Sequence, residues 1–286
     1  MMNDNRFDRN ERLFGKDGQD KLRATRILIA GAGGLGSHVA AQTALLGVGK
    51  IDVADKEELS LSNRNRYIGA WHNDPIPGST KVELAKRHIN LIDPDIEVVA
   101  INDDILSSTV LGAIQRADYV LGCVDNDGVR FFLNEACLAY EKPLIDLASD
   151  VPEAGVFGGH IAIVSGEHGC LHCRDLLDEK EVRQFLSSAE LLENEAAVYG
   201  IDASNLSETG PSVVSINGVV ASLGVTAFMA MATGMKLPYS FLTYRGDLGR
   251  VSRQMSETRR DCYYCSVVKG SGDIADLYRY FRKSAA

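Results

Sequence analysis

The sequence lacks a surplus of basic residues. Thirty Lys and Arg stand against 39 Asp and Glu, which gives a formal net charge of −9 over 286 residues. A general nucleic-acid-binding protein needs a basic surface that displaces counterions from phosphates. The charge balance therefore argues against a nucleic-acid partner, and any nucleotide that the protein holds is expected to be small.

The sequence also lacks a secretory signal and a clear membrane span. Residues 1–12 are polar and charged, without an apolar h-region. The most apolar stretch, residues 213–231, is interrupted by Gly, Ser, Asn and Thr, so it is expected to form a buried core helix. We expect a cytoplasmic protein without a membrane partner, in which paired cysteines hold metal rather than form disulfides.

Short apolar strands alternate with helices over the first half of the chain, which predicts an α/β fold with a doubly wound, mostly parallel sheet. The expected strands are residues 25–30, 50–55, 97–101, 119–124 and 143–147, and the expected helices are 35–46, 81–91, 106–114 and 129–139.

The alternation stops near residue 156. We expect a strand at 158–164, a helical crossover segment at 179–200, a polar mobile segment at 203–209, a long helix opened by Pro211, and antiparallel strands at 241–245 and 250–256. The predicted organisation is an N-terminal arm and helix (1–24), a Rossmann-like region that holds the nucleotide (25–155) and an antiparallel extension within the same compact domain (156–286).

A glycine-rich turn joins the first strand to the first helix of the alternating region. Its glycines are Gly31, Gly33, Gly34 and Gly36. Such a turn lets the backbone approach a phosphate, and the helix N-terminus offers unpaired N–H groups and a positive dipole end. Asp55 ends the next strand, where a carboxylate can hold ribose hydroxyls. Enzymes that use NAD share both features with enzymes that use ATP.

Further polar residues are expected at the same edge of the sheet, because the carboxyl ends of parallel strands line one crevice. Arg66 and Lys81 could hold a triphosphate and stabilise the charge of leaving pyrophosphate, and Asp125 could hold Mg²⁺. Taken singly, each has an ordinary structural alternative: a solvated loop, a surface lysine, and an Asp125-Asn126 pair that caps a helix. Their combination favours ATP, since hydride transfer needs none of them.

Four of the six cysteines form two Cys-x-x-Cys pairs. Two such pairs make a closed, structural Zn²⁺ site that would join the C-terminal strands to the extension. The ligands would be Cys170, Cys173, Cys262 and Cys265. Cys123 and Cys137 are expected in the core, where free cysteine behaves as a small apolar residue.

Taken in order, these motifs resemble the MoeB/ThiF/HesA family of adenylyltransferases, which is related to the ubiquitin-activating enzymes. The resemblance rests on residues 6–9, 13–15 and 18–19, the glycine turn, Asp55, 62–66, Lys81, 123–126 and both cysteine pairs. It implies an ATP site that includes Gly34, Asp55, Ser62, Asn63, Arg66, Lys81, Asp125 and Asn126, with Mg²⁺ on Asp125. It also implies a homodimer in which Arg9 reaches the partner's ATP, whereas from the residues alone Arg9 is a solvated terminal charge.

The resemblance implies adenylation of the C-terminal carboxylate of a ubiquitin-like protein or peptide, of the sulfur-carrier or conjugation type, with a Gly-type tail. Family members that form a thioester or persulfide carry a cysteine before the long helix, but residues 174–210 contain none. Ser204 and Ser207 lie near that place, yet a hydroxyl without a base is a poor nucleophile. We therefore expect the reaction to stop at the adenylate or to pass it to another protein.

Two departures from the family pattern favour an unusual substrate. Tyr67 stands where glutamine is common, and residues 68–78 form a longer stretch than usual.

Three other functions compete with this prediction. A nicotinamide-dependent oxidoreductase leaves Arg66, Lys81, Asp125 and the cysteine pairs without a role. A catalytically idle scaffold that binds a ubiquitin-like partner would be free to lose the nucleotide residues, which are all present. Adenylation of a carboxylate on a tRNA nucleoside fits poorly with the acidic charge and the zinc pairs.

Overall fold

An eight-stranded sheet forms the centre of the computed structural model, which describes residues 5–165, 168–186, 211–255 and 258–281. The strand order is β3-β2-β1-β4-β5-β6-β7-β8. The strands are β1 (Arg26–Ala30), β2 (Lys50–Ala54), β3 (Glu97–Ile101), β4 (Tyr119–Gly122), β5 (Leu144–Glu153), β6 (Val156–Val164), β7 (Phe241–Arg245) and β8 (Arg250–Arg253).

The first five strands are parallel and the last three are antiparallel. All pairings among β3, β2, β1, β4 and β5 are parallel, and β6, β7 and β8 join through antiparallel pairings. The predicted α/β class, the mostly parallel sheet and the antiparallel extension are confirmed. One continuous sheet runs through residues 25–155 and the extension.

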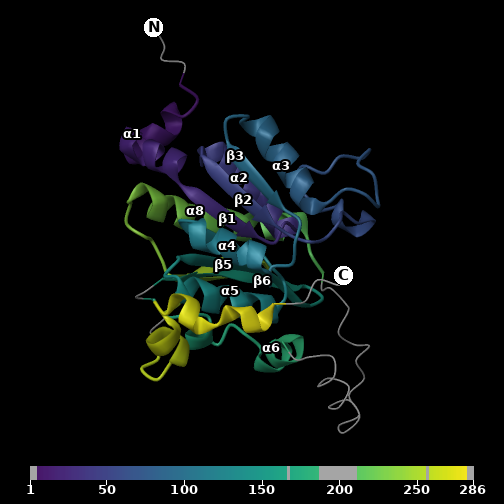
Figure 1. Ribbon diagram of the computed structural model, residues 1–286. Coiled ribbons are helices and arrows are strands. Elements are labelled where there is room, and N and C mark those ends of the chain that lie inside the picture. Colours follow the sequence, from purple (N-terminus) through teal and green to yellow (C-terminus); the bar gives the residue numbers. More distant parts are fainter. Residues whose placement is uncertain (1–4, 166–167, 187–210, 256–257, 282–286) are drawn as a thin grey trace.

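Helices cover both faces of the sheet (Figure 1). One core cluster lies under α1 (Asp8–Ala24), α2 (Gly34–Leu46), α3 (Lys81–Ile92) and α8 (Val214–Thr233). The other lies under α4 (Ser108–Arg116) and α5 (Asp127–Ala139) and includes residues of the C-terminal segment. The doubly wound arrangement follows from strands that are buried on both faces: in β1 and in β2, every residue after the first is buried.

Helix α8 is the apolar stretch noted in the sequence. By length and composition it could cross a membrane, with a mean hydropathy of 1.7, but half of that window is buried inside the protein. Its buried residues include Val220, Ala221 and Phe228, and the helix packs on α1, α2, β5 and β6. It is a core helix, as predicted.

Several predicted element ends were wrong by a few residues. Helix α4 starts at Ser108 rather than 106, because Ser107 caps it by accepting the Val110 N–H. Helix α5 starts at Asp127 rather than 129, because Asn126 caps it. Strand β5 continues to Glu153 by pairing with β6. Of the predicted crossover helix, α6 covers Glu179–Leu186; residues 187–200, the predicted mobile segment 203–209, Ser204 and Ser207 lie outside the described residues.

Candidate active site and metal centre

The glycine turn lies where β1 ends and α2 begins. Gly31 has φ +92° and donates its N–H to Ala54 O at 2.9 Å. A methyl group on Gly36 would lie 1.9 Å from Gly31 O, so no larger residue fits there. Gly33 is the N-cap of α2. The turn therefore presents the N-terminal N–H groups of α2 at the carboxyl edge of the sheet, a suitable place for an anion.

Asp55 lies directly beside this turn. Its carboxylate accepts the N–H groups of Ala32 and Glu57, both at 2.8 Å. Burial raises the pKa of Asp55, and the charge of Lys81 opposes that shift. The acid predicted to hold a ribose is thus fixed to the glycine turn by a hydrogen bond.

Lys81 is a buried cation and not a surface lysine. It opens α3 with only 7% of its side chain exposed, and its ammonium pairs with the carboxylate of Glu57, which is 63% exposed. Its carbonyl oxygen accepts the Tyr67 hydroxyl at 2.6 Å. A buried ammonium is costly unless it has a partner, and the partner of Lys81 is a carboxylate that is largely open to solvent.

Arg66 lies over the glycine turn. A methyl group on Gly34 would come within 3.1 Å of Arg66 Cγ and Cδ, and the guanidinium donates to Ser62 O. The short 3₁₀ helix before it, η1 (Leu61–Asn63), is held by a hydrogen bond from Ser60 N–H to Asn63 Oδ1 at 3.0 Å. A pocket of about 520 Å³ opens here, lined by Leu61, Ser62, Asn65, Arg66, Pro211, Ser212 and Val213.

Asp125 and Asn126 follow β4, next to the same turn. A methyl group on Gly31 would lie 2.7 Å from Cys123 O, so this strand end packs against the glycine turn. The Asp125 side chain is exposed. Asn126 Oδ1 accepts the N–H groups of Gly128 (2.9 Å) and Val129 (3.2 Å), as in the capping alternative. The carboxylate remains open to a ligand, whereas the amide oxygen is engaged in the cap.

Arg9 was also predicted as a site residue, but within a single chain it does not lie with the residues around the glycine turn. It is exposed on the first turn of α1, and within residues 5–165, 168–186, 211–255 and 258–281 none of the described contacts joins it to the glycine turn.

A buried ionic network that sequence reasoning missed lies at the first turn of α5, which begins two residues after Asp125. Arg130 binds Asp146 through two hydrogen bonds (3.1 and 2.6 Å), and it also donates to Asp127 Oδ1 (2.7 Å) and to Leu176 O (2.9 Å). Burial alone would raise the pKa of Asp146, but Arg130 and His160 hold it well below its usual value. The sequence signal that could have revealed this network was a charged residue inside each of two apolar segments: Arg130 in the segment that forms α5, and Asp146 in the segment that forms β5.

The four predicted zinc ligands come together. Their sulfur atoms lie within 4.8 Å of one another, and three pairs are 3.7 Å apart. A tetrahedron with Zn–S bonds of about 2.3 Å has edges of about 3.8 Å, so the cluster fits Zn²⁺. The cluster brings together segments 92 residues apart: Cys170 and Cys173 follow β6, whereas Cys262 precedes η5 (Tyr264–Val268) and Cys265 lies within it.

The other two cysteines are core residues. Cys123 and Cys137 are buried, and burial raises the pKa of both thiols. Neither is suited to act as a nucleophile, which requires the thiolate.

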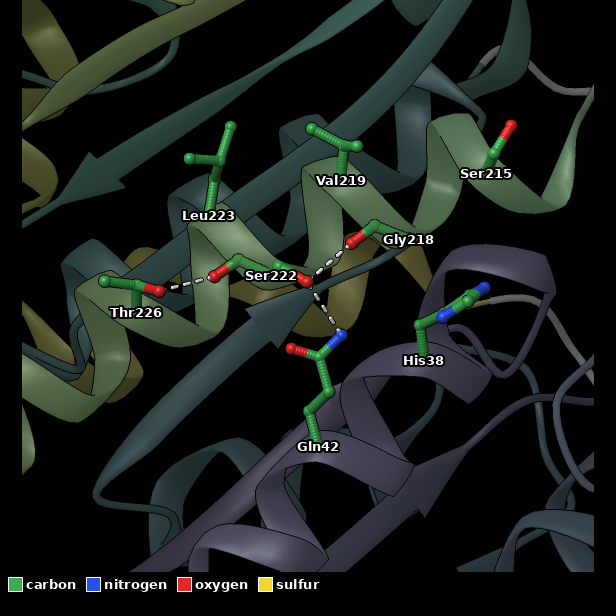
Figure 2. A pocket seen from close by; sticks show the side chains of 8 residues that line it. All are labelled: His38, Gln42, Ser215, Gly218, Val219, Ser222, Leu223 and Thr226. Atoms are coloured by element: carbon green, nitrogen blue, oxygen red, sulfur yellow. Dashed lines mark hydrogen bonds between the residues drawn. The ribbon is translucent and has the colours of Figure 1, made fainter. Parts of the chain in front are cut away.

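A second hollow, of about 420 Å³, lies between α2 and α8 on the outer surface (Figure 2). Gln42 Nε2 donates to Ser222 Oγ across it at 3.2 Å. It is lined by His38, Gln42, Ser215, Gly218, Val219, Ser222, Leu223 and Thr226. It contains none of the predicted site residues and no charged carboxylate or ammonium group.

The fold is an α/β sheet with a glycine turn at the carboxyl edge of its parallel strands, and four thiols lie close enough together to hold a metal ion. Comparison with known families takes the assignment further. The chain belongs to the ThiF family, whose model matches residues 7–266. It is therefore an adenylyltransferase, as the motifs predicted.

Individual relatives agree with this assignment. Protein HesA, vegetative, of Trichormus variabilis is 30% identical over 256 residues, which cover 89% of this chain and 85% of that protein. The sulfur carrier protein ThiS adenylyltransferase of Escherichia coli is 34% identical over 179 residues, covering 60% and 68%. The solved structure of the Microcin C7 biosynthetic enzyme MccB with N-formylated MccA shares the fold, with a TM-score of 0.75, 21% identity and coverage of 92% and 76%.

Proposed function

We propose that this protein binds ATP and adenylates the C-terminal carboxylate of a ubiquitin-like protein or peptide, releasing pyrophosphate. The observation that carries the proposal is the meeting of the α2 N-terminus, Asp55, Arg66 and Lys81 at one edge of the sheet. The relative named as a ThiS adenylyltransferase supports the substrate class.

The reaction requires the protein only to position the two reactants and to stabilise the charge of the phosphates. A carboxylate oxygen attacks the α-phosphorus, the bond to pyrophosphate breaks, and an acyl adenylate remains. Because the carboxylate is ionised at neutral pH, no general base is needed. Arg66 and Lys81 bind the phosphates, and Lys81 exchanges Glu57 for a phosphate oxygen.

Mg²⁺ would be held by Asp125, whose exposed carboxylate at the end of β4 provides the hard oxygen that this ion prefers. When bound, the ion neutralises phosphate charge. Asn126 fixes the direction of the chain at this turn by capping α5.

The protein forms no thioester of its own in this proposal. Residues 174–210 contain no cysteine, and the two cysteines outside the metal cluster are buried with raised thiol pKa values. The acyl adenylate therefore passes to a nucleophile on another molecule. Zn²⁺ in the four-thiolate cluster is structural, because four protein ligands leave no position for substrate.

The protein is cytoplasmic in this proposal. Its active form is a homodimer in which Arg9 acts on the partner's nucleotide. We assign the contact with the second copy to the face of α8 beside α2, because this helix is apolar and Val214 at its start remains 38% exposed. Mixing the inactive variants Arg9→Ala and Asp125→Ala tests the arrangement. Action across the interface restores activity in the mixed dimer; action within one chain leaves every site inactive.

Product analysis tests the proposed function against its rivals. With Mg²⁺ and a Gly-ended carrier, the protein should convert ATP to AMP and pyrophosphate, and it should bind ATP in preference to NAD. Lys81→Met serves as the matched control and should abolish turnover. Preference for NAD, or release of ADP and phosphate, would contradict the proposal.

A further inference from the structure

Asn217 is a buried amide inside the apolar helix α8, only 1% exposed. Its Oδ1 accepts the hydroxyl of Ser149 on β5 at 2.8 Å, and its Nδ2 donates to Ser212 Oγ at 3.1 Å. Ser212 belongs to the segment Pro211–Val213 that lines the pocket beside Arg66. One side chain thus connects the sheet to a wall of the candidate nucleotide site.

The same amide packs against the glycine turn. A methyl group on Gly34 would lie 2.5 Å from Asn217 Nδ2 and 3.1 Å from two carbons of Arg66. The absence of a side chain at Gly34 therefore admits Asn217 and Arg66 together. Both lie at the first turn of α2, where the anion is expected.

We infer that Asn217 is a positioning residue of the nucleotide site: its neutral amide holds the wall at residues 211–213, and the Arg66 side chain, against the glycine turn. This inference rests on the proposed function. An amide suits the place because it satisfies two hydroxyl partners without placing charge beside the phosphates. A carboxylate of the same shape would keep both serine partners, since each hydroxyl can donate to it, but it would repel the nucleotide.

Asn217→Asp is the most direct test. ATP affinity with Mg²⁺ is measured by titration as a function of pH and salt. We expect at least about tenfold weaker binding near pH 8, because like charges a few ångströms apart repel strongly in a partly buried site. The loss should shrink as the pH falls and the new carboxyl group becomes protonated. A residue that merely stabilises α8 would not make ATP affinity depend on pH in this way.

Asn217→Ala and Ser149→Ala form a matched pair in case the acidic variant fails to fold. Ser149→Ala removes one hydrogen bond of the same amide but leaves its contacts with Ser212 and the glycine turn, so ATP affinity should stay within about twofold of the parent. Asn217→Ala removes the wall contact, so it should weaken ATP binding or raise the KM for the acyl substrate by about tenfold, without a new pH dependence.

Equal effects of Asn217→Ala and Ser149→Ala on ATP binding and KM would overturn the inference, as would parental ATP affinity of Asn217→Asp at every pH. Failure of the proposed function looks different: the unsubstituted protein would then either not bind ATP or bind it without adenylating any carrier. Melting temperatures without ATP report any general loss of stability.

Discussion

Asp125 and its neighbour Asn126 should respond to substitution in opposite ways, although one peptide bond joins them. Asp125 is exposed, whereas Asn126 Oδ1 accepts two N–H groups at the start of α5. Asp125→Ala should lower adenylation about 10²–10³-fold, which corresponds to about 3–4 kcal/mol of lost electrostatic stabilisation. Its unfolding free energy should change by no more than about 0.5 kcal/mol, as for other exposed sites.

Asn126→Ala should instead cost about 1 kcal/mol of stability, the usual cost of a lost N-cap. For a chain of this size that lowers the melting temperature by about 2–4 °C. ATP–pyrophosphate exchange at increasing Mg²⁺, together with thermal melting, measures both effects. Parental exchange by Asp125→Ala would refute the magnesium role, and an unchanged melting temperature for Asn126→Ala would refute the capping argument.

Three further substitutions test other parts of the structure. Cys265→Ser should release zinc, measured by metal analysis, and should lower the melting temperature more than Cys137→Ala. Structural zinc contributes on the order of 10 kcal/mol in small zinc domains, whereas loss of one buried thiol costs about 1 kcal/mol; equal effects would exclude the metal site. Gly36→Ala should destabilise by about 3 kcal/mol or more in denaturant unfolding, because its methyl group would overlap a carbonyl oxygen; a smaller loss would contradict the packing. Arg130→Met should lower stability at neutral pH, where Asp146 is ionised. It should also flatten the acid-induced loss in the parent protein, which begins as the pH falls below about 4, the unfolded pKa, and continues towards the lower folded pKa. Parallel stability curves against pH would contradict this assignment.

Much of the fold was predictable because each signal was local. Alternating strands and helices indicated a parallel sheet, and the apolar β1 followed by the glycine turn identified where α2 begins. The ends of elements were less predictable because they depend on caps such as Asn126 and on pairing such as that of β5 with β6.

The candidate site was predictable where parallel topology brings strand ends together. Asp55 and the glycine turn share a hydrogen bond, as their places after β2 and β1 require. The partners of these residues were not predictable, because they come from distant segments. Asn217 follows Gly34 by 183 positions, and nothing in the sequence around either residue indicates their contact.

ATP–pyrophosphate exchange with a Gly-Gly-ended carrier tests the central claim most directly. The carrier is supplied intact and, as the matched control, with its last glycine removed. Exchange with the intact tail and not with the shortened one is the predicted result. Equal exchange with the intact and the shortened carrier would contradict adenylation of a C-terminal carboxylate. The absence of exchange with every carrier, although ATP binds, would contradict it too.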